Sequence, residues 1–360
     1  MSETHYHIIG GGIAGLTAAK YLKKYDAKAK VFLYEAAGKP GGRCFSYQDK
    51  ILNAKLDNAT HAVLKANTEA QKLLGKVKFN LSTLFYDLKT KEFSSGILRH
   101  KKEIAQALFN LPLEDVDKKI VKTVFKKMFP FINARKVYFS NNHLSEYLIN
   151  PQIQYIDEVH YNYVLKDIRG RDNQASKLVF NKETIALGEN DRVICAIDVH
   201  NFSRIFKTKE PQYSPIINIH YRTSTPITLP NLRTYIGVSG GMAQWILVNG
   251  EIISATISNA SGIKFSDEGL AREVWKEICQ IRGVEAAFVP PFRVLRHKRA
   301  TIRQDAVNNS IRPDNCQTQY QNFFIAGDWT MKNWPCSIEA AAQSGKRAAK
   351  AAVKPFKKSV

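Results

Sequence analysis

The sequence is poor in cysteine, and its five cysteines form no recognisable pair. Cys44, Cys195, Cys279, Cys316 and Cys336 are scattered along the 360 residues without a C-x-x-C spacing. Zinc sites and disulfide frameworks depend on closely or regularly spaced cysteines, so neither is expected. No metal site is predicted, and a reducing compartment fits this cysteine usage best.

Long apolar runs are also missing. No uninterrupted apolar stretch approaches the roughly 18 residues that a bilayer-spanning helix needs. The first residues, MSETHYH, lack the basic segment, the apolar core and the small-residue cleavage site of a secretory signal. The sequence therefore predicts a cytoplasmic protein that is either soluble or peripheral on the inner face of a membrane.

Acidic residues are scarce relative to basic ones. The chain has 32 Asp and Glu against 53 Lys and Arg, which gives a formal net charge of +21 at pH 7. Such an excess favours anionic partners, among them a nucleotide cofactor, an acidic membrane surface and nucleic acid, although a solvated Lys-rich surface explains it equally well. The sequence contains no nucleic-acid recognition module, so nucleic acid is not an expected partner.

One basic segment, residues 117–132, has the pattern of an amphipathic helix. A helix of this kind either lies in a membrane interface or packs its apolar face on the core of its own protein. An anionic membrane surface is therefore one candidate partner. The apolar face consists of Ile120, Val121, Val124, Phe125 and Met128, and the basic face of Lys118, Lys119, Lys122 and Lys126.

The glycines that the sequence does contain gather near its start, in THYHIIGGGIAGLTAAKYL. Residues 7–12 predict a buried strand and residues 13–25 predict a helix, so Gly10, Gly12 and Gly15 form G-x-G-x-x-G between them. In that setting the first glycine permits a tight turn, the second lets the backbone approach a pyrophosphate, and the third allows close packing of helix on strand. Because the helix N-terminus also attracts phosphate, the motif predicts dinucleotide binding.

An acidic residue follows this motif at a fitting distance. Residues 28–36 predict a second strand, and Glu35 lies near its end, 20 residues beyond Gly15. A carboxylate there can accept hydrogen bonds from ribose hydroxyls and would repel a 2′-phosphate, which argues against NADP.

The remaining chain alternates between helical and extended patterns. The strand NFFIAG ends at Gly327 and Asp328, and Pro335 and Ser337 suit the start of a closing helix. This order predicts an α/β fold in which a nucleotide-binding sheet is assembled from discontinuous pieces, with a second domain inserted. The other expected elements are helices over 60–77, 100–135 and 267–282, short strands between 154 and 197, antiparallel strands between 213 and 260, a strand over 292–297 and a helix over 337–352.

Several segments together resemble one enzyme family. GKPGGRC, residues 38–44, resembles the extended FAD fingerprint of the flavin amine oxidase and phytoene desaturase superfamily. LDNATHAVLKANTEAQKLLGKV, VYFSNNHLSEYLINP, the strands from YSPIINIHYRT to IISATISNAS, and VLRHKRATIRQ followed by FFIAGDWT…WPCSIEAAAQSGKRAA are similar, in order, to the squalene-associated FAD-dependent desaturases, the hydroxysqualene dehydroxylases. The chain departs from that family at Ala59-Thr60, where Gly-Gln is usual, and in a shorter region 65–138 that helps to wall the substrate cavity.

The resemblance implies the cofactor, the domains and the roles of individual residues. FAD would bind a discontinuous Rossmann-like domain (1–60, 151–205 and 291–360), and an inserted α+β substrate domain (61–150 and 206–290) would contain the antiparallel sheet. Asp328 would lie against the ribityl chain or phosphate, and the backbone amides of Ser337 and Ile338 would face N1 and O2 of the flavin. The predicted cofactor-binding residues are Gly10, Gly12, Ile13, Ala14, Gly15, Glu35, Ala36, Gly42, Arg43, Val164, Gly327, Asp328, Ser337 and Ile338.

The resemblance also implies a reaction, in which reduced FAD gives a hydride to an allylic carbon of an isoprenoid alcohol as the hydroxyl group leaves. Because hydroxide is a poor leaving group, Asp57 and His61 are candidate proton donors, although a histidine on an apolar helix is more often a core residue. The alternatives are another amine oxidase-type oxidase or desaturase, acting on an amine or a carotenoid precursor, and an FAD-binding protein without turnover. Trp245, Trp329, Trp334 and Tyr235 are candidates either for an apolar cavity wall or for ordinary core.

Overall fold

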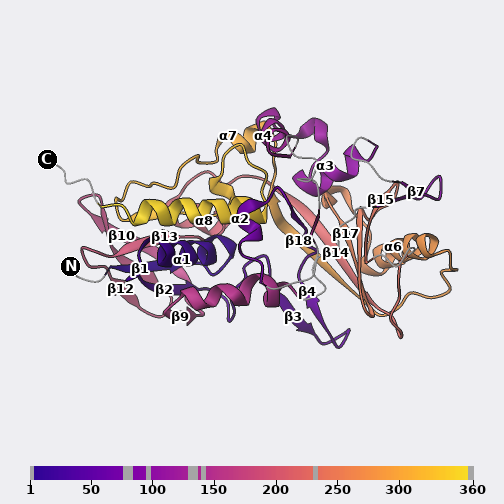
Figure 1. Ribbon diagram of the computed structural model, residues 1–360, viewed down its shortest axis with the longest axis horizontal. Coiled ribbons are helices and arrows are strands. Elements are labelled where there is room, and N and C mark those ends of the chain that lie inside the picture. The colour runs from indigo at the N-terminus through magenta and orange to yellow at the C-terminus, as the bar shows by residue number, and fades with distance from the viewer. Residues whose placement is uncertain are drawn as a thin grey trace.

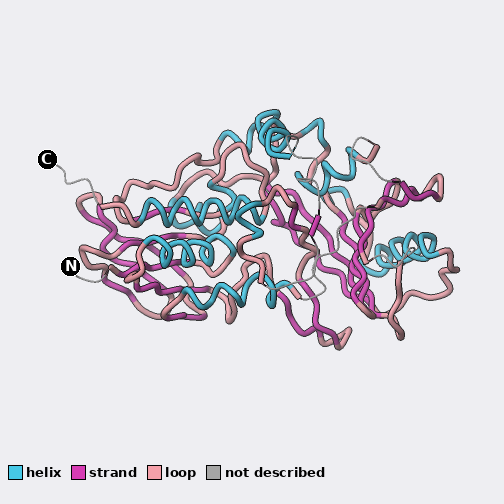
Figure 2. The backbone as a smooth tube through the Cα atoms, viewed as in Figure 1, coloured by secondary structure: helices cyan, strands magenta, loops and turns pink. Residues whose placement is uncertain are grey.

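The computed structural model describes residues 4–75, 84–94, 99–128, 137–138, 143–229 and 234–355. Two large sheets lie at opposite ends of the long axis of the molecule (Figure 1). Helices lie along the first sheet, and strands dominate the half that holds the second (Figure 2). Among the described residues, no helix has both the length and the apolar composition that crossing a membrane requires.

The first sheet is parallel and gathers strands from distant parts of the chain. Its order is β19-β13-β1-β2-β9, and each neighbouring pair is parallel. This is the expected Rossmann-like sheet built from discontinuous pieces, and the α/β fold class is confirmed. The strands are β1 (His5–Ile9), β2 (Lys30–Glu35), β9 (Glu158–Tyr161), β13 (Arg192–Cys195) and β19 (Phe323–Ile325).

Two helices pack on this sheet and on each other. α1 (Ile13–Tyr25) follows β1 directly, and α8 (Ile338–Ala352) lies beside it (Figure 1). The helices approach closely because Gly345 faces α1, where a Cβ atom would overlap the carbonyl oxygen of Ala14. The alanines of α8 serve the same packing, since Ala342, Ala348 and Ala349 are fully buried.

The second sheet is mainly antiparallel and has seven strands in the order β18-β14-β17-β16-β15-β6-β7. Helix α6 (Asp267–Arg282) begins at the N-cap Ser266, ends at Gly283, and belongs to the same hydrophobic cluster as this sheet. The strands are β6 (Phe85–Asp87), β7 (Glu92–Ser94), β14 (Tyr213–Arg222), β15 (Tyr235–Ser239), β16 (Trp245–Asn249), β17 (Ile252–Ile257) and β18 (Phe292–Ile302).

Smaller elements join and flank the two sheets. A three-stranded antiparallel sheet is formed by β10 (Leu165–Arg171), β11 (Gln174–Phe180) and β12 (Thr184–Ala186). The remaining pairs are β3 (Ser46–Asp49) with β4 (Ala54–Asp57), and β5 (Val63–Leu64) with β8 (Val137–Tyr138). The remaining α-helices are α2 (Thr68–Gln71), α3 (Lys101–Phe109), α4 (Lys118–Met128), α5 (Val199–Phe206) and α7 (Ala306–Ser310).

The predicted helix over 60–77 is wrong for most of its described length. Only α2 is α-helical, because Val63 and Leu64 pair with β8 and the Asn67 side chain accepts a hydrogen bond from the Leu64 amide at 2.7 Å. Such a local side-chain bond competes with helix formation. His61 therefore lies in a loop and not on a helix. Residues 76–77 lie outside the described part of the chain.

The predicted helix over 100–135 is two helices. α3 ends where Asn110 adopts a left-handed conformation (φ 52°), and Pro112 precedes the turn that leads to α4. Both features stop a helix, the first by reversing the backbone and the second by lacking an amide proton. Residues 129–135 lie outside the described residues. The hairpin β3–β4 and helix α5 had no counterpart in the sequence prediction.

The predicted strand over 292–297 extends to Ile302 as β18, which pairs with β14 in the seven-stranded sheet. The predicted FAD-binding segment 291–360 thus begins with a strand of the larger sheet. The division of the chain into two domains stays a prediction.

Candidate active site

A cavity of about 1220 Å³ is lined by residues from both large sheets. The N-terminal ends of α1 and α8 line one side, and β14, β16 and β17 line the other. Its volume exceeds the roughly 300–1,000 Å³ of typical ligand pockets, so a cofactor and a second molecule can share it.

The first glycine motif forms one end of this cavity. Gly10 has a φ of +103°, and a Cβ atom there would lie 2.8 Å from the Ala196 carbonyl oxygen. Among the described residues, the nearest atom to a Cβ atom on Gly12 would be the Gly42 Cα atom at 3.9 Å, so this glycine leaves space in the cavity wall. The amides of Ile13, Ala14 and Gly15 open α1 and have no intrahelical acceptor. The turn thus has the space and the donors that a pyrophosphate requires.

Glu35 is fixed at the end of β2 beside this turn. Its Oε2 accepts a hydrogen bond from the Gly11 amide at 2.6 Å, and its Oε1 accepts one from the Ala37 amide at 2.7 Å. Glu35 and Ala36 both line the cavity. Each carboxylate oxygen keeps a lone pair for a ribose hydroxyl, as the sequence motif requires.

The second glycine pair packs directly on the first motif. The Gly41 amide donates to the Gly11 carbonyl at 2.8 Å, and a Cβ atom on Gly42 would lie 3.2 Å from the Gly12 Cα atom. Gly41 and Gly42 both have positive φ, at 126° and 59°, which favours glycine. The two glycine clusters therefore form one continuous wall.

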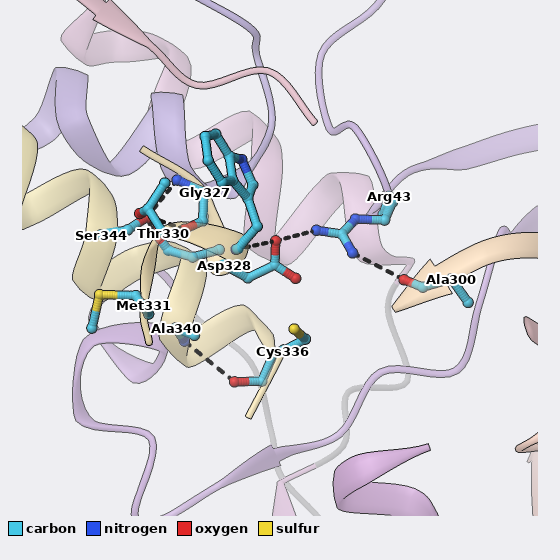
Figure 3. A network of polar contacts seen from close by, with 12 residues as sticks. Arg43, Ala300, Gly327, Asp328, Thr330, Met331, Cys336, Ala340 and Ser344 are labelled. Atoms are coloured by element: carbon cyan, nitrogen blue, oxygen red, sulfur yellow. Dashed lines mark hydrogen bonds and ion pairs between the residues drawn. The ribbon is translucent and has the colours of Figure 1, made fainter. Parts of the chain in front are cut away.

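Arg43 joins this wall to the C-terminal part of the chain (Figure 3). Its Nη2 donates to Asp328 Oδ1 at 2.7 Å, and its Nη1 donates to the Ala300 carbonyl at 2.9 Å. The Asp328 carboxylate is buried and holds the pKa of Arg43 above its ordinary value. Gly327, Asp328 and Arg43, three of the predicted cofactor-binding residues, all line the cavity.

The N-terminus of α8 also borders the cavity. Ser337 is the N-cap, and its Oγ accepts a hydrogen bond from the Ala340 amide at 3.2 Å. The amides of Ser337 and Ile338 have no intrahelical acceptor, so the partial positive end of the helix lies at the cavity. This is the arrangement that stabilises an anionic reduced flavin.

Val164 lines the cavity too, and the chain before it is tied to β2. The Tyr163 amide donates to the Glu35 carbonyl at 2.9 Å, and the Val164 amide donates to Asn181 Oδ1 at 2.7 Å. Val164 is therefore placed beside the acidic residue that the motif analysis singled out.

The two candidate catalytic residues are placed differently. Asp57 lines a second cavity of about 330 Å³, where its Oδ1 accepts hydrogen bonds from Ser46 Oγ at 2.6 Å and the Leu144 amide at 3.0 Å. His61 lines both cavities, and its Nε2 lies 3.3 Å from the Arg43 carbonyl oxygen. Burial lowers the pKa of His61, which favours a neutral imidazole. Of the two, only His61 borders the large cavity.

The wall formed by the second sheet and its neighbouring helices is mixed: apolar side chains come mainly from β6, β15, β16 and α3, and β18 adds a basic stretch from Arg296 to Arg299. Tyr235 and Trp245 stack with their ring centroids 5.1 Å apart. The four aromatic residues suggested by the sequence all line the cavity. Tyr235, Trp245 and Trp329 also belong to buried hydrophobic clusters, whereas Trp334 is half-buried. The apolar lining includes Phe85, Ile104, Leu108, Val124, Tyr235, Trp245, Trp329 and Trp334.

Arg312 is a positioning residue that the sequence did not suggest. It is 3% exposed, and its guanidinium donates to the carbonyl oxygens of Asp328 at 2.8 Å, Met331 at 2.6 Å and Trp334 at 2.8 Å. It therefore holds the loop that connects Asp328 to the start of α8. An isolated arginine outside any motif gives no sequence signal for such a role.

The fold and the cavity define an FAD-dependent oxidoreductase, with a Rossmann-like sheet and an antiparallel sheet on either side of one site. The family model of flavin containing amine oxidoreductases matches residues 154–353, and an NAD(P)-binding Rossmann-like domain model matches residues 8–77. The chain belongs to the flavin-containing amine oxidoreductase family.

Curated relatives match almost the whole chain. A hydroxysqualene dehydroxylase from Zymomonas mobilis is 28% identical over 418 alignment positions, which cover 97% of this chain and 98% of the relative. A second, from Rhodopseudomonas palustris, is also 28% identical, with 97% and 98% covered. Because these alignments exceed the 360 residues of the chain, the relatives contain segments that it lacks.

A solved structure supports the fold independently. Cyclohexylamine oxidase from Brevibacterium oxydans superposes with a TM-score of 0.69 at 12% identity, over 98% of this chain and 99% of that one. The antiparallel second sheet and the Rossmann-like sheet are thus combined as in a known amine oxidase fold.

Proposed function

We propose that this enzyme reduces an isoprenoid alcohol in the manner of a hydroxysqualene dehydroxylase. Reduced FAD, when bound, supplies a hydride. The substrate carbon exchanges its C–O bond for a C–H bond, and the hydroxyl group leaves with the bonding electrons and takes up a proton to become water. The observation that carries the proposal is the similarity to two hydroxysqualene dehydroxylases over nearly the full chain.

The predicted cofactor-binding residues come from both ends of the chain, and each end suits a different part of FAD. The Gly10–Gly15 turn and the start of α1 suit the pyrophosphate, and Glu35 suits the ribose. Asp328, held by Arg43, and the amides of Ser337 and Ile338 suit the ribityl and flavin parts. The apolar side chains that β6, β15, β16 and α3 contribute to the cavity support an apolar substrate, since they exclude water from the space beside them.

Product analysis tests the proposed reaction. The FAD-loaded protein is reduced with dithionite without oxygen, mixed with hydroxysqualene, and the extract is analysed by gas chromatography and mass spectrometry. Squalene should form as the flavin absorbance returns. Unchanged hydroxysqualene in the presence of fully reduced enzyme would overturn the proposal, and oxidation of an amine by the oxidised enzyme would point to the amine oxidase alternative.

We also propose that α4 holds the protein against an anionic membrane surface, from which an apolar substrate enters. Lys118, Lys119 and Lys122 are exposed on this helix, and Val124 lines the cavity. The apolar face that the sequence suggested for insertion is largely used internally, since Ile120 is fully buried and Val121 and Val124 pack with it. The attraction would therefore be mainly electrostatic.

Vesicle sedimentation tests this membrane proposal. Vesicles of phosphatidylcholine with phosphatidylglycerol should pull down the protein, and vesicles of phosphatidylcholine alone should not. Replacing Lys118, Lys119 and Lys122 by Gln should weaken sedimentation, whereas the same change at Lys276 and Lys298 should have less effect. Equal sedimentation with both vesicle types would contradict the proposal.

A further inference from the structure

We propose that Asn218, Thr256 and Trp245 form a polar subsite that binds the hydroxyl oxygen of an isoprenoid alcohol. This inference rests on the proposed function for the kind of substrate and deepens it. It assigns a specificity-determining role to three residues, of which the sequence analysis suggested only Trp245, as part of an apolar wall.

The three residues lie in one row across the second sheet. The register places Asn218 on β14 opposite Thr256 on β17, and Thr256 opposite Trp245 on β16. All three line the large cavity. Directly opposed residues share one face of a sheet, so their side chains are neighbours on the wall that faces the substrate space.

Two hydrogen-bond donors in this row lack an acceptor. The Asn218 side chain is fully buried, and its Oδ1 accepts a hydrogen bond from Thr256 Oγ at 2.9 Å, but within the described residues its Nδ2 has no partner. Trp245 is 8% exposed, and its Nε1 likewise has no partner in the part of the chain that the structure describes. Buried donors are rarely left without an acceptor, because removing them from water costs free energy that a hydrogen bond must offset.

Beyond Trp245 the row borders an apolar part of the cavity wall, whereas the basic residues Arg296 to Arg299 of β18 lie on the Asn218 side. Gly237 is paired with Trp245 on the next strand, and a Cβ atom there would overlap the ring of Phe85. That ring continues the wall as an apolar surface, together with Ile104 and Leu108 from α3. A polar row within such a wall suits a ligand with a single polar group.

An alcohol matches this set of donors and acceptors. The Asn218 amide and the Trp245 indole can both donate to its oxygen. Thr256 Oγ, whose proton is directed to Asn218, keeps lone pairs that can accept the proton of the alcohol. Donors that hold the oxygen in the bound alcohol also favour the negative charge that develops on it as the C–O bond breaks.

Binding to the oxidised, FAD-loaded enzyme tests the subsite without turnover. The probes are hydroxysqualene and squalene, which differ in the hydroxyl group, and binding is followed by perturbation of the flavin spectrum. The wild-type protein should prefer hydroxysqualene. Trp245→Phe, which keeps an aromatic ring and removes the N–H, and Asn218→Leu should each reduce that preference by about tenfold while leaving the squalene affinity nearly unchanged.

A matched control and the alternative outcomes separate the explanations. Ile216→Val changes another cavity residue of β14 without altering a polar group, so it should affect both ligands equally. Equal preference of the wild-type protein for the two probes would overturn the subsite, as would variants that lower both affinities alike. If Asn218→Leu fails to retain FAD, the preference of Trp245→Phe for hydroxysqualene over squalene alone tests the subsite.

Failure of the proposed function gives a different pattern. In that case the reduced wild-type enzyme leaves hydroxysqualene unchanged, although the oxidised enzyme still prefers the alcohol and loses the preference in the variants. The product measurement and the binding measurement thus fail independently.

Discussion

Arg43 and Asp328, which are 285 positions apart in the sequence, form an ion pair of 2.7 Å at the cavity. Arg43 follows the second glycine pair, and Asp328 follows β19, so the pair connects the first and last parts of the nucleotide-binding sheet. The Asp328 side chain is 6% exposed, whereas that of Arg43 is 50% exposed and lines the cavity. The carboxylate is thus buried, while its half-exposed partner Arg43 borders the cavity.

Neutralising Asp328 should weaken both the fold and cofactor retention. Asp328→Asn removes the charge that pairs with Arg43, and a hydrogen bond to a charged group contributes about 1.5–3 kcal/mol. Urea unfolding of the apoprotein and the flavin content of the purified protein measure the two effects. Glu273→Gln removes an exposed ion pair with Lys276 and should change stability by less than about 1 kcal/mol. Equal effects of the two substitutions would contradict this account.

Two glycines of the first motif should respond to alanine in opposite ways. Gly12 has an ordinary φ of −78° and space beside it, so Gly12→Ala should fold normally and lose FAD affinity by at least about tenfold. Gly15→Ala would place a Cβ atom on the Gly10 carbonyl oxygen, so it should destabilise the fold itself. Thermal unfolding of the apoproteins and FAD titration separate the two. A Gly12→Ala protein that binds FAD normally would remove Gly12 from the cofactor site.

The glycine motifs and the closing strand and helix were predictable because their physics is local. A tight turn, a close backbone approach and an N-cap each depend on a few consecutive residues, so Gly10–Gly15 and Ser337 could be assigned from the sequence. The region after residue 60 was not predictable in this way. There the Asn67 side chain and the pairing of Val63 with β8, which is distant in sequence, override a helical pattern.

The substrate-side wall was predictable only in part: Trp245 and Tyr235 were suggested as wall residues, but the polar row was not. Asn218 and Trp245 face one cavity only because three strands align in one register, and no local pattern encodes that register. The turn and the N-cap that the sequence proposed for the cofactor therefore follow from local patterns, whereas the pairing of Asn218 with Thr256 and Trp245 does not.

His220 should make the fold sensitive to acid. It is buried on β14, its Nδ1 lies 2.8 Å from Ser254 Oγ, and burial lowers its pKa to about 4. In the unfolded chain the His220 imidazole takes up a proton near its ordinary pKa of about 6.5. The neutral, buried His220 therefore makes its full contribution to the free energy of unfolding above that pH, and this contribution is lost as the pH falls toward 4. Urea unfolding should show that the free energy of unfolding falls by about 2 kcal/mol between pH 7.5 and pH 5 on account of this residue.

A substitution isolates that contribution from the other buried histidines. His61, His100 and His297 also have lowered pKa values through burial and titrate in the same direction. His220→Gln should therefore flatten the pH dependence in part, by about the amount assigned to His220. His200→Gln, at a partly exposed position paired with Glu210, is the control. A pH dependence that is identical in the wild-type protein and His220→Gln would refute the assignment.

Replacing Arg312 by lysine should weaken both the fold and cofactor binding, although the positive charge is kept. Its guanidinium donates to four backbone carbonyls in the loop between Asp328 and α8, and the single ammonium of a lysine cannot reach all of them. Buried carbonyls without a donor cost about 1–3 kcal/mol, and the loop that places Asp328 and the α8 N-terminus should loosen. Arg312→Lys should therefore lower both the free energy of unfolding and the affinity for FAD, measured by urea unfolding and by fluorescence titration.

Arg272→Lys on the exposed side of α6 makes the same exchange away from the cavity and should alter neither the free energy of unfolding nor the affinity for FAD. If both variants bind FAD as tightly as the wild-type protein, Arg312 does not position this loop for the cofactor.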